Sequence, residues 1–209
     1  MNENDTSFEI LIKLVIIGDS GVGKSNYLYR FVEGEFCQLH ESTIGFDYKS
    51  KITMLPESKI NVKFQVWDTA GQEQYMSINK NLFQRVQGII LMYDISAESS
   101  FQNLGQWMDL IKEYGNNIPL ILIGNKIDLE EKRVVSKEKG EEFAKQNNLK
   151  LFESSGKTGV NVEESFRYIG EKIIALNKKD TNSDTNSKGK EYVISKETTF
   201  SKNKKKNCC

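Results

Sequence analysis

GDSGVGKS, residues 18–25, lies directly between the apolar run LVII and a stretch with helical periodicity. It matches the pattern GxxxxGK[ST] in the strand-to-helix setting that this pattern requires. Glycines let backbone N–H groups converge on phosphate oxygens, and the following helix start adds the positive end of its dipole. We expect Lys24 to reach the β and γ phosphates and Ser25 to ligate Mg²⁺. The segment predicts a nucleoside triphosphate site made of Gly18, Asp19, Ser20, Gly21, Val22, Gly23, Lys24 and Ser25.

Apolar, β-branched runs alternate with amphipathic segments from Glu9 to about Leu176, as in parallel strands joined by helices. The second and third runs are separated only by LPESK, which suits a hairpin and is too short for a crossover helix. The predicted fold class is α/β, with a six-stranded, mostly parallel sheet, one antiparallel edge strand and about five helices. Strands are expected at 10–18, 46–54, 60–68, 88–94, 119–125 and 149–155, and helices from near Gly23, Ser77, Ser99, Ser136 and Asn161.

The composition fits one domain with a tail. Lys and Arg number 29 against 29 Asp and Glu, so the net charge shows no bias toward nucleic acid. No apolar run approaches the ~20 residues needed to span a bilayer, and the start of the chain does not resemble a secretory signal. We expect a flexible N-terminus at 1–8, a folded cytosolic domain at 9–176 and a disordered tail at 177–209.

The base is predicted by NKID, residues 125–128, which follows the apolar run PLILIG. A carboxylate at the end of such a strand can accept both the N1–H and the 2-amino group of guanine, a donor pair that adenine lacks. Asp128 is the expected acceptor, with Asn125 and Lys126 beside it. Downstream of the phosphate loop, this spacing favours GTP over ATP.

Together, these segments resemble the Ras superfamily of small GTPases, and within it the Rab family, from about residue 9 to 176. The motifs that carry the resemblance stand in family order: GDSGVGKS (18–25), STIG (42–45), WDTAGQE (67–73), NKID (125–128) and ESSGK (153–157). The resemblance implies the P-loop NTPase fold of small G-proteins. It also implies that Phe36 packs its ring against the guanine, and that the base is approached by Ser155, Gly156 and Lys157. The family usually has Ala in place of Gly156, where a backbone N–H is expected to meet the guanine oxygen, so a looser loop is predicted.

The same resemblance assigns the hydrolytic chemistry. Thr43 is expected to join Ser25 on Mg²⁺ with support from Asp68, the N–H of Gly71 to meet the γ-phosphate, and Gln72 to orient the attacking water. Lys24, Thr43, Gly71 and Gln72 are thus the predicted catalytic group. Residues 36–45 contain no Arg that could act in cis, so intrinsic hydrolysis should be slow and should need an activating protein.

Two features depart from the common Rab pattern. The segment after the second switch reads LFQRV (82–86) where a YYRGA-like sequence is typical. In many Rabs a Phe, Trp and Tyr cluster helps effectors recognise the active state, and the matching positions here are Tyr48, Trp67 and Leu82. We interpret the chain as a divergent member of the family, with its own choice of effectors.

The chain ends in KKKNCC (204–209), which resembles the double-cysteine ending on which Rab proteins receive geranylgeranyl groups. Two lipid signals are needed for stable anchoring, and each Lys near anionic lipid adds about 1 kcal/mol. Lipidation is therefore expected at Cys208 and Cys209. The resemblance implies a monomer that regulates vesicle traffic on the cytoplasmic face of an intracellular membrane and cycles with the cytosol. Its partners would be an exchange factor, an activating protein, a GDP-dissociation inhibitor or escort, and effectors on the two switches.

Two alternatives remain open. One is a GTP-binding recruitment scaffold with negligible hydrolysis, against which Gln72 argues. The other is an ATP-using P-loop enzyme, which would need a substrate pocket or lid. The identity of the nucleotide bound to purified protein separates the second from the GTPase reading.

Overall fold

The computed structural model describes residues 7–37, 46–69, 83–115 and 117–183. Its centre is a six-stranded sheet in the order β2-β3-β1-β4-β5-β6. Neighbouring strands are parallel except β2 and β3, which form an antiparallel hairpin at one edge. The predicted α/β sheet with one antiparallel edge strand is thereby confirmed. The strands are β1 Ile10–Ile17, β2 Phe46–Leu55, β3 Ile60–Thr69, β4 Gly88–Asp94, β5 Leu120–Asn125 and β6 Lys150–Glu153.

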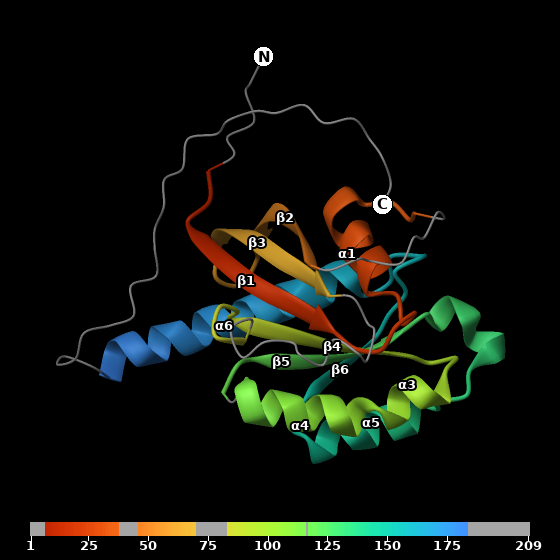
Figure 1. Ribbon diagram of the computed structural model, residues 1–209. Helices are drawn as coiled ribbons and strands as arrows, with labels where there is room; N and C mark the ends of the chain where they lie inside the picture. Colours follow the sequence, from red (N-terminus) through yellow and green to blue (C-terminus); the bar gives the residue numbers. More distant parts are fainter. Residues whose placement is uncertain (1–6, 38–45, 70–82, 116, 184–209) are drawn as a thin grey trace.

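Helices cover both faces of this sheet (Figure 1). Helices α1 and α6 pack on one face, and α3, α4 and α5 pack on the other. Ser136 caps α5 as expected, because its hydroxyl accepts the N–H of Lys139 at 3.3 Å. The helix predicted near Ser77 lies outside the described residues. The helices are α1 Lys24–Glu33, α3 Glu98–Gln102, α4 Leu104–Tyr114, α5 Lys137–Gln146 and α6 Val162–Ser183, with a 3₁₀ segment η2 at Ile127–Lys132.

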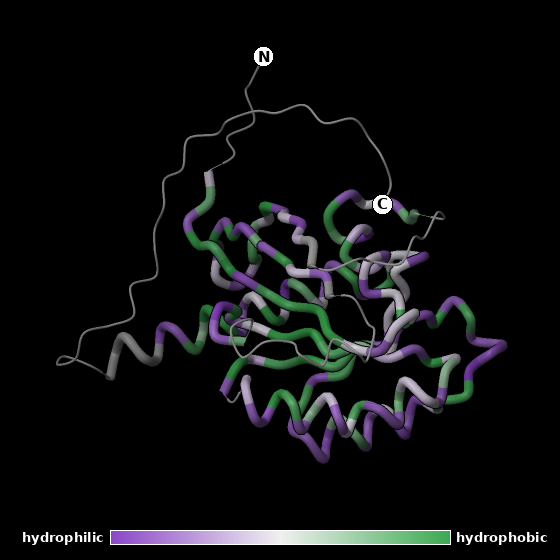
Figure 2. The backbone as a smooth tube through the Cα atoms, viewed as in Figure 1, coloured by the Kyte–Doolittle hydropathy of each residue, from purple (hydrophilic) through white to green (hydrophobic). Residues whose placement is uncertain are grey.

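Burial on both faces explains the uninterrupted apolar strands. In β1, Leu14 and Ile16 join the core beneath α1 and α6, whereas Val15 and Ile17 join the core beneath α4 and α5. All seven residues of β4 are buried. Figure 2 shows that hydrophobic residues, coloured green, are concentrated in these central strands. A sheet enclosed in this way requires continuous apolar runs rather than alternation.

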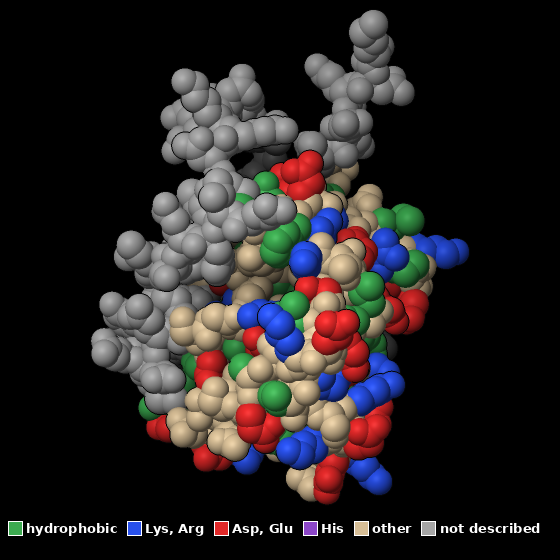
Figure 3. Space-filling view, turned by 90° about the vertical axis from the view of Figure 1, so that its right-hand side faces the viewer, with side chains coloured by type: hydrophobic (Ala, Val, Ile, Leu, Met, Phe, Trp, Pro, Cys, Tyr) green, Lys and Arg blue, Asp and Glu red, His purple; other side chains and the backbone are tan. Residues whose placement is uncertain are grey.

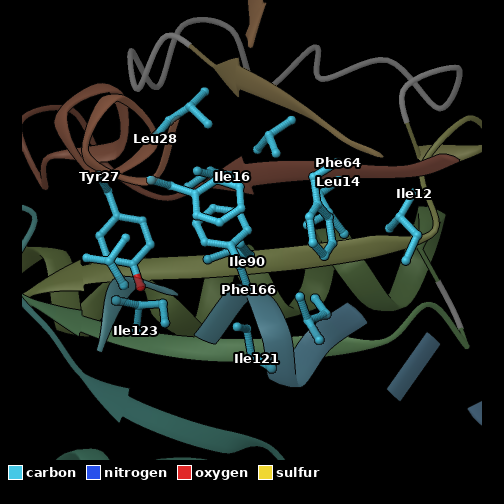
Figure 4. Packing of buried hydrophobic residues seen from close by; sticks show 14 of the residues in the cluster. Ile12, Leu14, Ile16, Tyr27, Leu28, Phe64, Ile90, Ile121, Ile123 and Phe166 are labelled. Carbon is cyan, nitrogen blue, oxygen red and sulfur yellow. The ribbon is translucent and has the colours of Figure 1, made fainter. Parts of the chain in front are cut away.

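An aromatic stack joins α1 to α6 (Figure 4). The rings of Phe31 and Phe166 are nearly parallel, with centroids 3.6 Å apart. Tyr27 and Phe64 flank Phe166 at centroid distances of 5.9 and 6.1 Å. Helix α1, which begins at the phosphate loop, is thus held against both α6 and the sheet.

Helix α6 continues to Ser183, beyond residue 176, where the sequence suggested the end of the domain. The segment NKKDTNS has little apolar content, but an established helix adds residues at low cost because its nucleus is already formed. Within the described residues, no helix combines the length and apolarity needed to cross a membrane.

Replacing Phe166 with Ala should lower the free energy of unfolding by about 3–5 kcal/mol, because it leaves a cavity between α1, α6 and the sheet. Urea denaturation measures this loss. The matched control on the same helix is Arg167→Ala, which removes only an exposed side chain 3.7 Å from Glu163 and should change stability by less than about 0.5 kcal/mol. Equal stability of the two variants would contradict the role given to the stack.

Candidate nucleotide-binding site

The phosphate loop turns between β1 and α1 in a backbone conformation that needs glycine. Gly18 has φ +143°, and a Cβ there would lie 2.2 Å from the carbonyl oxygen of Met92 in β4. Gly23 has φ +98°, and a Cβ there would lie 2.6 Å from Nδ2 of Asn125. Any larger residue at these positions would collide with its neighbour and also strain the backbone. The loop therefore fits closely against β4 and the end of β5.

Lys24 is the first residue of α1, and its ammonium group turns back into the loop. Its Nζ donates to the carbonyl oxygens of Gly18 at 2.8 Å and Asp19 at 2.7 Å. Burial lowers the pKa of Lys24 to about 8, an effect that the nearby carboxylates of Asp68 and Asp19 partly oppose. Phosphate oxygens near this ammonium would favour its charged form. The predicted phosphate-binding Lys is thus in place inside the loop.

Asp19 has a structural role that the sequence did not reveal. Asp19 as a residue is only 8% exposed, and its carboxylate accepts hydrogen bonds from two side chains of the α3–α4 region. Nδ2 of Asn103 donates to Oδ2 at 2.7 Å, and Nε1 of Trp107 donates to Oδ1 at 2.8 Å. The side chain of Asp19 therefore ties the phosphate loop to α4, which leaves its backbone as the part available to phosphate.

Asn125 connects the phosphate loop to the base loop, which we define as residues 154–158. Its Nδ2 donates to the carbonyl oxygen of Val22 at 2.8 Å, and its Oδ1 accepts the N–H of Gly156 at 3.1 Å. Lys126, the next residue, donates from Nζ to the carbonyl oxygen of Gly21 and to Asp94, both at 2.7 Å. NKID and the phosphate loop thus form one continuous site, as the motif spacing indicated.

The base loop in turn holds Asp128. The hydroxyl of Ser155 donates to Oδ1 of Asp128 at 2.6 Å, and the same oxygen of Ser155 accepts the N–H groups of Lys157 and Thr158 at 3.2 and 3.0 Å. Nζ of Lys157 lies 4.0 Å from the Asp128 carboxylate. The carboxylate is therefore fixed in direction, with acceptor capacity left beyond its bond to Ser155.

Gly156 is more firmly supported than expected. Its N–H donates to Asn125, so a guanine oxygen meeting this amide would share or replace that bond. Its carbonyl oxygen accepts Nε of Arg30 at 3.1 Å. Where the sequence suggested a looser loop, the structure supplies contacts on both sides of the glycine.

Comparison with known proteins agrees with this geometry. The model of the Ras family matches residues 13–175. Human Ras-related protein Rab-15 is 43% identical over 174 residues, which cover 83% of this chain and 81% of that protein. Ras-related protein Rab-8B of Bos taurus is 40% identical over 200 residues, 93% of this chain and 96% of that protein. The chain belongs to the Rab family of small GTPases. Ras-related protein Rab-10 of Diplobatis ommata is a further relative, 43% identical over 169 residues that cover 80% and 84% of the two chains.

Family membership gives the fold and the broad activity. The described elements form the P-loop NTPase fold of small G-proteins, and the activity at this level is GTP hydrolysis, with GTP and GDP as ligands. Figure 3 views this Rab-family protein from the side toward which β1 points, and acidic and basic side chains are interspersed there.

Two of the residues predicted to bind Mg²⁺, Ser25 and Asp68, are described, so their suitability as ligands can be judged from the structure. Ser25 is the second residue of α1, and Asp68 lies buried at the end of β3, close enough to Lys24 to affect its pKa. A hydroxyl and a carboxylate beside a phosphate site suit Mg²⁺, which prefers oxygen ligands and takes the remainder from substrate phosphates and water. Among the described residues, no group of three or more His, Cys, Asp or Glu could hold a metal ion.

Several predicted residues lie outside the described part of the chain. These are Thr43, Gly71, Gln72, Leu82, Cys208 and Cys209. Phe36 is described and half-buried shortly after α1. Tyr48 and Trp67, two of the three positions expected to contact effectors, have ring centroids 5.2 Å apart, and Tyr48 is 52% exposed.

Replacing Trp107 with Phe should destabilise the protein by about 1.5–3 kcal/mol, because the buried Asp19 carboxylate loses one of its two side-chain donors. Chemical denaturation in urea measures the change. Tyr168→Phe is the control, since Tyr168 lies on the exposed side of α6, and its loss of a hydroxyl should cost less than about 0.5 kcal/mol. A Trp107→Phe protein as stable as the parent would show that the indole N–H does not support the loop.

Proposed function

We propose that this Rab-family protein is a GTP/GDP switch that hydrolyses GTP slowly and regulates vesicle traffic while lipid-anchored to a membrane. The observation that carries the nucleotide assignment is the Asn125 bridge between Val22 of the phosphate loop and Gly156 of the base loop. Phosphate and base motifs are adjacent in space although more than a hundred residues separate them in sequence. The family relatives support the traffic role, because they are Rab proteins.

The base would be read by Asp128. Its carboxylate accepts the N1–H and 2-amino groups of guanine in this proposal, while Ser155 holds it in direction at 2.6 Å. Asn125, Lys126, Gly156 and Lys157 complete the base site, and the half-buried ring of Phe36 packs beside it. A purified protein that releases guanine nucleotide on denaturation would support this assignment, whereas adenine nucleotide would refute it.

The phosphates would be bound by the loop backbone and by Lys24, whose ammonium exchanges carbonyl partners for phosphate oxygens. Ser25, Thr43 and Asp68 would hold Mg²⁺, which supplies charge neutralisation to the β and γ phosphates when bound. Gly71 would donate its N–H to the γ-phosphate, and Gln72 would orient the attacking water. Loss of the γ-phosphate would then release both switch segments.

The timing of hydrolysis would depend on a partner. Residues 36–45 contain no Arg, and an arginine supplied from outside is worth roughly 10³–10⁵ in rate. The proposed partners are therefore an activating protein, an exchange factor, a GDP-dissociation inhibitor or escort, and effectors that contact the switches near Tyr48 and Trp67.

In single-turnover assays, the isolated protein should cleave GTP slowly, and a cognate activating protein should accelerate cleavage by about 10³-fold or more. Gln72→Leu should lose most of this acceleration while binding GTP as tightly as the parent, because only the orientation of water is changed. Gln74→Leu, two residues away, is the control and should retain activity. Fast cleavage by the isolated protein would refute the need for a partner, and no cleavage under any condition would favour the recruitment scaffold.

The domain is proposed to end near residue 176, within α6, which itself continues to Ser183. The tail that follows would carry the anchor at Cys208 and Cys209. The basic run KKKN immediately before them would add attraction to anionic lipid. The protein would thus reside on the cytoplasmic face of an intracellular membrane and return to the cytosol with a carrier.

A fluorescently tagged Cys208→Ser/Cys209→Ser variant should lose membrane localisation and become uniformly cytosolic, because both lipid attachment points are gone. A Cys37→Ser variant controls for the replacement of a cysteine elsewhere in the chain and should keep the localisation of the parent. Imaging in the native cell type and mass spectrometry of the tail measure the two effects. Uniform cytosolic signal for the parent itself would eliminate the lipid anchor.

A further inference from the structure

Arg30 lies near the end of α1 and directs its guanidinium group at three backbone carbonyl oxygens. Nη1 donates to Gly34 at 2.6 Å, where α1 ends, and Nε donates to Gly156 at 3.1 Å. Nη2 donates to Lys157. Two of the three acceptors therefore belong to the base loop, which lies 126 and 127 residues further along the chain.

Packing between α1 and the base loop is close at the same place. A Cβ at Gly156 would lie 3.3 Å from both N and Cα of Tyr27, so the glycine brings the two backbones near contact. The side chain of Asn125 also holds Gly156, because its Oδ1 accepts the backbone N–H of Gly156. The peptide groups around Gly156 are thus fixed by α1 on one side and by the end of β5 on the other.

We propose that Arg30 is a positioning residue for base recognition, an inference that rests on the proposed guanine site. The side chain binds loop carbonyls and leaves the nucleotide to other residues. By holding the Gly156 and Lys157 carbonyls, it sets the direction of the neighbouring amides and of Ser155, which in turn orients Asp128. Loosening this contact would weaken the contacts to the base and leave those to the phosphates intact.

The planar guanidinium group suits this task. It offers five donors in a fixed fork, so one side chain can satisfy several carbonyl oxygens in different directions. An ammonium group on a flexible stem cannot hold the same three positions at once. Arg30 also contacts Gly34, so a role limited to closing the end of α1 is the competing explanation. That role would affect stability without affecting selectivity for the base.

The test compares the dissociation constants of GDP and of purine riboside diphosphate, which keeps the ribose, the phosphates and the ring system but lacks O6, N1–H and the 2-amino group. Isothermal titration calorimetry of each nucleotide with the full-length protein, in the presence of Mg²⁺, gives both constants. The parent should prefer GDP, and Arg30→Ala should reduce this preference about tenfold, a loss of about 1.4 kcal/mol. Affinity for the analogue should stay within twofold. Arg167→Ala, an exposed arginine on α6, is the matched control and should match the parent.

Arg30→Lys keeps the charge and most of the stem, and it serves if the Ala variant does not fold. It should show a reduced preference between those of the parent and Arg30→Ala. Equal weakening of both nucleotides, or an unchanged preference in both variants, would overturn the positioning role. A parent protein without preference for GDP would instead refute the guanine site, and the positioning role with it.

Discussion

Asn125 uses both ends of its side-chain amide at once, donating to the Val22 carbonyl and accepting the Gly156 N–H. The amide group of Asn offers an N–H donor and a carbonyl acceptor in fixed relative positions, and Gln, the other amide, has a longer side chain. A carboxylate would repel the Val22 carbonyl, and an apolar residue would leave two buried backbone groups without this partner. This one planar group thus links the phosphate loop directly to the base loop.

Charge within the site is balanced locally. Lys24 donates to backbone carbonyl oxygens and lies near the carboxylates of Asp19 and Asp68. Lys126 pairs with Asp94, and the buried carboxylate of Asp19 accepts two directed hydrogen bonds. Such arrangements hold the loop in shape at low dielectric, where an unpaired charge would be costly. Lys24, Lys126 and Asp19 thus stabilise the backbone of the phosphate loop.

Most of the fold was predictable because its signals are local. Six apolar runs became six strands, the short LPESK connection became a hairpin, and Ser136 capped a helix. The single helix expected from Ser99 is divided at Asn103 into α3 and α4, a break that serves the contact with Asp19. The phosphate loop, NKID and the base loop also lie next to one another, as expected for motifs of one site.

The supporting contacts could not be predicted in the same way. Whether the indole N–H of Trp107 points at the loop depends on how α4 is rotated on the sheet, and hydrophobic periodicity reports only that the residue is buried. In the sequence, Arg30 likewise cannot be distinguished from an ordinary arginine on the surface of a helix. The one available signal was the presence of Asn103 four residues before Trp107, a spacing that places both on one face of a helix. Thr43, Gly71 and Gln72 of the switches lie outside the described part of the chain, so their assignment rests on sequence.

Contacts across the site join residues that are far apart in the sequence. Asp19 meets Trp107 across 88 residues, Asn125 meets Val22 across 103, and Arg30 meets Gly156 across 126. Closing such long loops costs conformational entropy. We therefore expect these contacts to form late in folding, once the sheet holds the ends of the loops together. Only a chain folded through the base loop can assemble this site, so a nucleotide that binds there would stabilise the folded molecules by mass action.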